Sequence, residues 1–313
     1  MMRIFRNIAV IGVMLLMGCI SRGTSQSDTE KSEVQRPRHM ECSFNPAEIT
    51  SYEEYRTAIE HYWDDFDFEA GANVAEYDKD FIAQLFVDYV IYIEPEHADK
   101  LLRTLMQRAS ASREVFDLFY EISEIVLHDP NSPLRNDEYY IPILECVIAS
   151  PLFDEYEKIA PRYDLDIALK NRIGRVATNF EYTLADGRTG WLHDIDADYT
   201  ILMFSNPDCP MCREIMNLIT SSPLLNELTE RGTLTTISIY PDEDIKAWRR
   251  YLPNMPHRWI CGYDKEMALT TQRLYNLNAI PSLYLLDKEK RVLIKDGTNV
   301  AHIENVIAYD AAK

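Results

Sequence analysis

The chain has 313 residues, enough for two domains, and 46% of them are hydrophobic, which excludes a wholly disordered protein. It carries 51 Asp and Glu against 32 Lys and Arg, and the resulting net charge of −19 repels phosphate backbones, so nucleic acid is excluded as an expected partner. Only ten residues are glycine, and neither G-x-G-x-x-G nor a Walker A pattern occurs, so we expect no phosphate-cradling loop and no cofactor.

Residues 1–18 have the order of an export signal peptide. Arg3 and Arg6 precede an apolar run over Ile8–Met17, which is shorter than the ~20 apolar residues that span a bilayer. Leu16-Met17-Gly18-Cys19 resembles a lipobox, and this resemblance implies cleavage before Cys19 and a lipid on its thiol. The alternative is an uncleaved anchor helix. Either way, we expect a membrane-anchored cell-envelope protein that faces the periplasm or the cell surface, with the choice of inner or outer membrane left open.

Residues 19–40 are predicted to be a flexible tether behind the lipidated cysteine. Ser21–Arg38 contains almost no apolar residue and is rich in Ser, Thr, Gln, Glu and Arg. Such a segment cannot bury enough surface to offset the entropy lost on ordering.

Residues 41–175 are predicted to form an all-α domain. Ser51 and Glu54 form a candidate capping box at the start of an apolar helical stripe that runs from Tyr52 to Phe66. The domain holds 29 acidic and 12 basic residues, which we interpret as solvated helix faces. Pro95 and Pro151 fit the first turns of their helices. Further helices are expected at Asp80–Ile93, Pro95–Ala109, Ser112–His128, Asn136–Ala149 and Pro151–Asn171.

No catalytic constellation stands out in this helical half. His61, His97 and His128 are widely spaced and make no metal-ligand pattern such as H-x-x-x-H. The segment at 130–142 resembles an uncharacterised helical domain that precedes thioredoxin-like domains in some bacterial lipoproteins. That resemblance supports a domain boundary near residue 175, and it leaves the role of the helical domain open.

Residues 176–313 alternate between strands and helices. Phe180–Leu184 and Thr189–Leu192 flank Asp186-Gly187 and predict a hairpin. This order predicts an α/β domain in which a central mixed sheet has helices on both faces. Strands are expected at Thr200–Phe204, Leu234–Tyr240, Ser282–Asp287 and Val292–Lys295, and helices at Pro210–Thr220, Asp242–Tyr251, Lys265–Tyr275 and Val300–Tyr309.

The motif Cys209-Pro210-Met211-Cys212 lies at the junction of a predicted central strand and the following helix. At a helix N-terminus, the backbone N–H groups and the helix dipole favour the Cys209 thiolate. Cys212, one turn later, is close enough to attack a mixed disulfide at Cys209 and release a partner. The spacing therefore predicts a redox-active pair.

Together with Ala279-Ile280-Pro281-Ser282 before a strand, this arrangement resembles a thioredoxin fold. The pattern around Gly174–Gly187, followed by a strand and the C-P-M-C motif, more narrowly resembles envelope-tethered thioredoxin-like thiol–disulfide oxidoreductases. The resemblance covers residues 176–313. It implies that Cys209 is the attacking thiol, Cys212 the resolving thiol and Pro281 the cis-proline beside them.

Two positions depart from this family pattern. Asp208 stands before the first cysteine, where the family often has Trp, and its charge opposes a thiolate at Cys209. Met203 stands where many thioredoxins keep a buried acid that assists proton transfer to the second cysteine. Glu214 or a water molecule is left as a candidate substitute.

Alternatives to redox catalysis are a structural disulfide and half of a zinc site. A zinc site needs a second ligand pair, and His257 with Cys261 would have to meet the motif across the fold. The other cysteines, Cys42, Cys146 and Cys261, are odd in number, so they cannot all pair within one chain. We expect Cys146 to be a buried apolar thiol and leave the state of Cys42 and Cys261 open.

Two functional hypotheses follow. In the first, the protein is a lipid-anchored thiol–disulfide oxidoreductase that acts on envelope proteins with thiols or disulfides and exchanges electrons with a membrane redox donor. In the second, the helical domain captures a partner and the thioredoxin-like domain is a scaffold. The direction of electron flow, as reductase, oxidase or isomerase, is not fixed by the motif.

Overall fold

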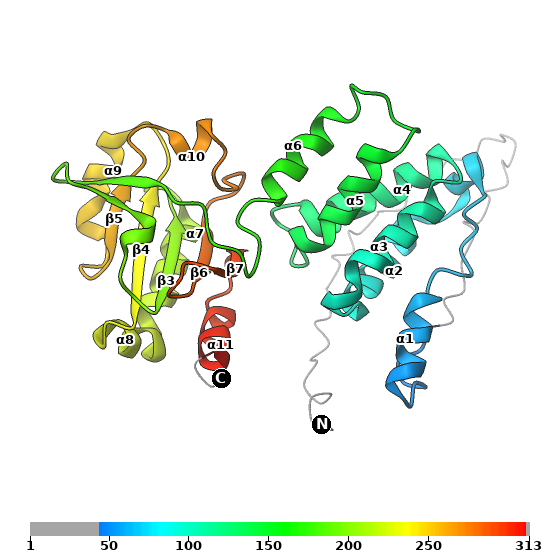
Figure 1. Cartoon of the computed structure of the whole chain (residues 1–313), viewed down its shortest axis with the longest axis horizontal. Coiled ribbons are helices and arrows are strands. Elements are labelled where there is room, and N and C mark those ends of the chain that lie inside the picture. Colours follow the sequence, from blue (N-terminus) through cyan, green and yellow to red (C-terminus); the bar gives the residue numbers. More distant parts are fainter. Residues whose placement is uncertain (1–43, 311–313) are drawn as a thin grey trace, which may run out of the picture. The chain divides into compact units, whose positions relative to one another are not determined.

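The computed structural model describes residues 44–310. Helices make up its first portion, and a sheet with flanking helices makes up the second (Figure 1). Cys19, Cys42 and the predicted signal peptide and tether lie outside the described residues. Among residues 44–310, no helix is both long and apolar enough to cross a membrane.

The helical portion follows the predicted order of helices. The helix α1 begins at the predicted capping box, in which the Glu54 N–H donates to Ser51 Oγ over 3.2 Å and the Glu54 carboxylate accepts from the Ser51 N–H over 3.2 Å. The elements are α1 (Tyr52–Glu60), a 3-10 turn (Gly71–Glu76), α2 (Lys79–Tyr92), α3 (Pro95–Ala109), α4 (Arg113–Ser123), a π-helical turn (Glu124–His128), α5 (Asp137–Ala149) and α6 (Ile159–Ala168).

The aromatic stripe that starts in α1 leaves the helix after Glu60, which corrects the prediction of a continuous helical face. Tyr62, Trp63 and Phe66 are buried from a series of turns, whereas Tyr52 is 56% exposed. The Trp63 ring meets the Phe119 ring edge-on, with 5.0 Å between centroids. Such edge-to-face pairs add to simple apolar burial, so packing against α4 sets the path of this segment.

The helix predicted over Pro151–Asn171 is also shorter than expected, since α6 begins only at Ile159. Pro151 lies in a turn and not at a helix start. The Asp154 side chain accepts the N–H groups of Tyr156 and Glu157, each over 2.9 Å. A side chain that satisfies nearby backbone donors in this way competes with helix formation.

The second portion is built on a seven-stranded mixed sheet with the order β2-β1-β5-β4-β3-β6-β7. The central strand β3 pairs in parallel with β4 and antiparallel with β6. Every residue of β3 is buried, as expected of a strand covered on both faces. The strands are β1 (Glu181–Leu184), β2 (Thr189–Trp191), β3 (Tyr199–Phe204), β4 (Leu234–Tyr240), β5 (Ile260–Tyr263), β6 (Ser282–Leu286) and β7 (Val292–Gly297).

Helices cover both faces of this sheet (Figure 1). On one face, apolar residues of α7 (Pro210–Ser221) and α11 (Val300–Asp310) pack against Ile201, Met203 and Leu283. On the other face, Phe180, Tyr275 and the short helix α10 (Ala268–Thr271) pack against Leu202 and Phe204. The predicted thioredoxin-like α/β fold is therefore confirmed, as is the helical region before it.

Two elements were not predicted, and one is shorter than predicted. The helix α8 (Pro223–Glu230) starts directly after α7, because Ser222 caps its N-terminus and Pro223 occupies its first turn. The strand β5 lies between β4 and β1. The helix predicted over Lys265–Tyr275 is reduced to the four residues of α10, whereas α9 (Ile245–Tyr251) lies within its predicted range.

Candidate functional site

The motif C-P-M-C occupies the turn from β3 into α7, and its two cysteines form a disulfide with 5.2 Å between their Cα atoms. Cys209 is the residue that caps α7, and Pro210 lies in the first turn, where its missing N–H costs no helical hydrogen bond. The strand end and the helix start therefore fix the position of Cys209.

The first cysteine is the accessible one. Cys209 is half-buried, whereas Cys212 is only 4% exposed and packs in the apolar cluster under α7. The Cys212 N–H donates to Cys209 Sγ over 3.0 Å. This donor and the positive end of the helix dipole favour negative charge on Cys209 Sγ once the disulfide is opened. The arrangement suits Cys209 for attack and Cys212 for resolution.

Pro281 lies beside this pair, as the sequence resemblance implied. The Ile280–Pro281 peptide bond is cis, and the Ile280 carbonyl oxygen lies 3.7 Å from Cys209 Sγ. The sulfur in the disulfide carries no hydrogen to donate, so this approach is a van der Waals contact. Ile280 lies 71 residues after Cys209 in the chain, so the fold brings the cis-proline and the cysteine pair together where β3 ends and β6 begins.

The structure places the residues at which the sequence departs from the family pattern. Met203 is 1% exposed and lies in the same apolar cluster as Cys212, so the position under the second cysteine carries no acid. Glu214 is exposed on α7, as is Asp208 in the loop before the disulfide. The Asn206 side chain in that loop donates to Asp242 over 3.0 Å.

Two free cysteines lie in the described residues, and neither belongs to this site. Burial raises the pKa of the Cys146 thiol, and it raises that of Cys261 to about 11. Both groups are therefore protonated near neutral pH and are poor nucleophiles. Cys146 is half-buried, somewhat more accessible than the buried thiol predicted for it.

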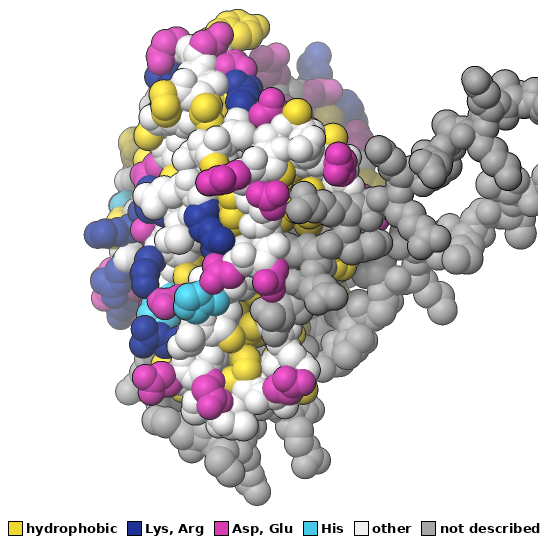
Figure 2. Space-filling model, turned by 90° about the vertical axis from the view of Figure 1, so that its right-hand side faces the viewer, with side chains coloured by type: hydrophobic (Ala, Val, Ile, Leu, Met, Phe, Trp, Pro, Cys, Tyr) yellow, Lys and Arg dark blue, Asp and Glu magenta, His cyan; other side chains and the backbone are white. Residues whose placement is uncertain are grey.

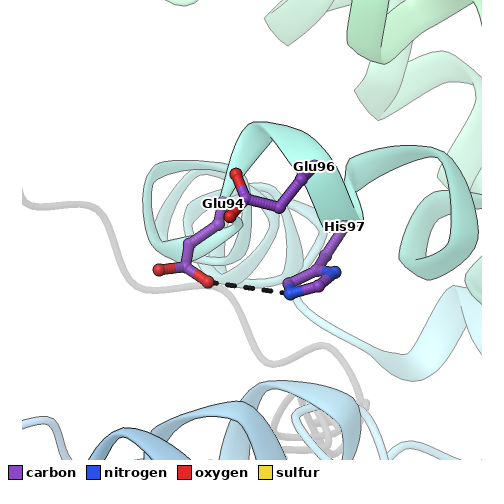
Figure 3. A group of neighbouring side chains, drawn as sticks. All are labelled: Glu94, Glu96 and His97. Carbon is purple, nitrogen blue, oxygen red and sulfur yellow. Dashed lines mark ion pairs between the residues drawn. The ribbon is translucent and has the colours of Figure 1, made fainter.

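A second group of polar side chains, Glu94, Glu96 and His97, was missed in the sequence because its spacing matches no standard ligand motif. Among residues 44–310 it is the one cluster of three or more His, Cys, Asp or Glu side chains whose ligand atoms lie within 4.8 Å of one another. Glu94 and His97 point toward each other, with Oε2 and Nε2 3.8 Å apart (Figure 3). Glu94 Oε2 also accepts from the Tyr52 hydroxyl over 2.6 Å. Acidic groups are commonly found at a helix N-terminus such as that of α3, where they stabilise the helix dipole.

The acidic side chains of the helical portion are spread over its surface. The face drawn in Figure 2 shows Asp and Glu scattered among Lys and Arg, without one dense acidic patch. Several are paired, such as Glu60 with Lys100 over 2.8 Å and Asp64 with Arg108 over 2.7 Å. This distribution fits the interpretation of solvated helix faces.

A mixed sheet with a cysteine pair at the N-terminus of the helix after its central strand, facing a cis-proline, defines the class of thioredoxin-like proteins. Comparisons agree with this class. A thioredoxin-like protein from Bacteroides caccae is 37% identical, with a TM-score of 0.81 over 87% of this chain and 99% of that chain. The chain therefore belongs to the thioredoxin-like protein family.

Two family models match separate segments of the chain. The family described as thioredoxin-like matches residues 196–292, and a domain of unknown function, DUF5106, matches residues 19–171. The C-terminal domain of an uncharacterized protein from Bacteroides fragilis is 42% identical and covers 44% of this chain and 98% of that chain, with a TM-score of 0.43. Nucleoredoxin of Xenopus laevis is 24% identical over 104 residues, which are 33% of this chain. This match covers 25% of the length of that nucleoredoxin.

Proposed function

We propose that the protein is a lipid-anchored thiol–disulfide oxidoreductase that acts on cell-envelope proteins through Cys209 and Cys212. The observation that carries this proposal is the asymmetry of the pair: Cys209 is only partly buried and its Sγ accepts the Cys212 N–H, whereas Cys212 is 4% exposed. A purely structural disulfide needs no such difference between its two sulfurs.

The reaction transfers two electrons in two exchanges. In the reduced protein, the Cys209 thiolate attacks a substrate disulfide, forms a mixed disulfide and expels one substrate thiolate, which takes up a proton. Cys212 then loses its proton and attacks Cys209 Sγ, which forms the Cys209–Cys212 disulfide and releases the second substrate thiolate. The substrate is reduced by two electrons, and a membrane dithiol donor returns them to the protein. The reverse sequence oxidises a substrate dithiol.

The anchoring part of the proposal rests on Leu16-Met17-Gly18-Cys19. We expect mass spectrometry of the mature protein to find a lipid-modified Cys19 as the first residue. An intact Met1 or a free Cys19 thiol would contradict it.

The redox part is tested by replacing each cysteine in turn. Cys212→Ser is expected to accumulate mixed disulfides through Cys209 in an envelope extract, since the resolving thiol is missing. Cys209→Ser and the double variant are expected to trap nothing and to lose disulfide reductase activity. Cys261→Ser is the matched control, because that thiol is protonated at neutral pH and its loss leaves trapping and activity unchanged. An inert wild-type protein, or a trap that runs through Cys212, would overturn the assigned roles and favour the partner-binding hypothesis for the helical portion.

A further inference from the structure

A cavity of about 530 Å³ is lined at one end by Ala279 and Pro281, and residues of the helical portion line one side of it. Ala279 and Pro281 contribute the end that adjoins Cys209, because the Ile280 carbonyl oxygen between them is the group in contact with Cys209 Sγ. The segments at 130–138 and 293–302 supply further walls. We call this cavity the cis-proline groove.

The wall at 130–138 consists of the loop before α5 and the first two residues of α5. Hydrogen bonds within this segment fix its conformation. The Asn131 N–H donates to Asp129 Oδ1 over 2.7 Å, and the Asn136 N–H donates to the Leu127 carbonyl over 2.9 Å. The Asn136 side chain then caps α5 by accepting the Glu138 N–H over 3.0 Å. Two prolines, Pro130 and Pro133, restrict the loop further.

The same wall is fixed against β7 by two ion pairs. Asp137 Oδ2 lies 2.8 Å from Lys295 Nζ, and these side chains are 8% and 6% exposed. Arg135 pairs with Asp296, at exposures of 13% and 8%. Lys295 Nζ also donates to the carbonyls of Ala168 and Lys170, each over 2.7 Å. A wall held in this way is formed before any ligand arrives, which lowers the cost of binding.

The chemistry of the cis-proline groove fits an uncharged polypeptide segment. Each Lys and Arg that lines it is paired with an Asp, and the lining carboxylate Glu138 is paired with Arg172. Among the described lining side chains, this leaves His302 as the ionisable group outside these pairs, and no unpaired Lys or Arg to hold a carboxylate or phosphate. The Thr298 hydroxyl and the Asn299 side-chain amide NH2 offer polar groups, and Pro133, Ile173 and Leu293 offer apolar contacts. The Ser132 hydroxyl already donates to the Val126 carbonyl, and Asn299 Oδ1 already accepts the His302 N–H over 3.1 Å. This mixture of a few polar groups among apolar ones is typical of sites that bind an extended chain.

We propose that the loop at 130–138 of the helical portion forms the second wall of a substrate groove, which holds an extended, uncharged segment beside the substrate cysteine during exchange at Cys209. This inference rests on the proposed redox function and adds a role for the helical portion in selecting protein substrates. A substrate joined to Cys209 has to pass Ile280 and Pro281, and the cis-proline groove is where its chain continues. A small-molecule disulfide, in contrast, reacts at Cys209 without contacting the wall at 130–138.

The test fills the groove from the helical wall and compares two substrates. Pro133→Trp places an indole in the groove, whereas Pro151→Trp makes the same change at an exposed turn outside it. We expect Pro133→Trp to lower kcat/KM at least tenfold for a disulfide-bonded peptide with uncharged flanking residues. Its rate with glutathione disulfide should stay within twofold of wild type, and Pro151→Trp should change neither rate.

Thr298→Trp fills the groove from the opposite wall and keeps the test informative if Pro133→Trp fails to fold, which thermal unfolding reports. Peptide rates equal to those of Pro151→Trp for both groove variants would overturn the proposal. So would an equal loss with peptide and small disulfide, because that result places the effect at the disulfide itself. A wild-type protein that is inert with both substrates would instead refute the proposed redox function.

Discussion

At the scale of single residues, the ring of Tyr182 depends on two glycines in neighbouring strands. A Cβ on Gly190 would lie 2.6 Å from the Tyr182 hydroxyl oxygen, and one on Gly262 would lie 2.9 Å from Tyr182 Cδ2. Real Cβ atoms do not approach so closely, so the two bare backbones make the space that the buried Tyr182 ring fills. Glycine is required here by close approach and not by an unusual φ.

We therefore expect Gly190→Ala to lower the free energy of unfolding by about 1–3 kcal/mol, the usual cost of overpacking. In a Tyr182→Ala background the clash is absent, and the same substitution should cost less than about 0.5 kcal/mol. Denaturant unfolding of the four proteins of this cycle measures the coupling between the two sites. Additive effects would show that the Tyr182 ring does not depend on Gly190.

The placement of single residues was the part of the site that the sequence predicted best. The placement of Cys209 at a helix start and of Pro281 beside it depends on short motifs with fixed local geometry. The wall at 130–138 was not predictable in this way, because it reaches the site through pairs such as Arg135 with Asp296, 161 residues apart in the chain. The residues around each member of such a pair contain no sequence pattern that would identify the other member.

At the scale of elements, helices with clear end signals were predicted closely and short elements were not. Ser51, Ser112 and Asn136 each cap a helix near the predicted start. The prediction failed at α6 and α10, where apolar periodicity continues although turns take over the backbone. Met267 and Arg273, at φ values of 53° and 52°, bracket α10 and confine it to one short turn. Tertiary contacts determine whether such segments are helical, and the local helix propensity of the sequence does not predict those contacts.

The start of α1 offers a pH test of one such end signal. Hydrogen bonds from the Thr50 N–H and hydroxyl, over 2.9 and 2.8 Å, lower the pKa of Glu54 below its ordinary value of 4.5. A lowered pKa contributes stability that is present above pH 4.5 and is lost as pH falls through the folded value. We expect Glu54→Gln to be less stable than wild type at neutral pH, with the difference shrinking below pH 4.5.

Glu53→Gln is the matched control, because it removes the same charge from the same first turn. Within the described part of the chain, no hydrogen bond to the Glu53 carboxylate is found. Thermal unfolding at neutral pH should therefore give a smaller difference from wild type for Glu53→Gln than for Glu54→Gln. Parallel curves for Glu54→Gln and wild type down to acid pH would contradict the stabilising role of the Thr50 hydrogen bonds to Glu54.

At the scale of the whole molecule, buried ion pairs join the helical portion to the sheet portion. The pair between Asp137 and Lys295 is almost completely shielded from water, at 8% and 6% exposure. Removing one charge of a buried pair leaves the other uncompensated, which usually costs more than the pair itself contributes. The backbone adds to this connection, since the Gly174 N–H donates to the Val292 carbonyl over 2.8 Å.

We expect Asp137→Asn, which keeps the shape of the side chain, to lower the free energy of unfolding by about 3 kcal/mol. Asp186→Asn removes a carboxylate from the exposed pair with Arg188, at 55% and 76% exposure, and should cost less than about 1 kcal/mol. Asp137 belongs to the helical portion and Lys295 to the sheet portion. Asp137→Asn should therefore also weaken the coupling between the unfolding of these two portions. Calorimetry of Asp137→Asn is then expected to resolve two unfolding transitions where wild type shows one. A single transition at the wild-type temperature would mean that the backbone contacts alone hold the two portions together.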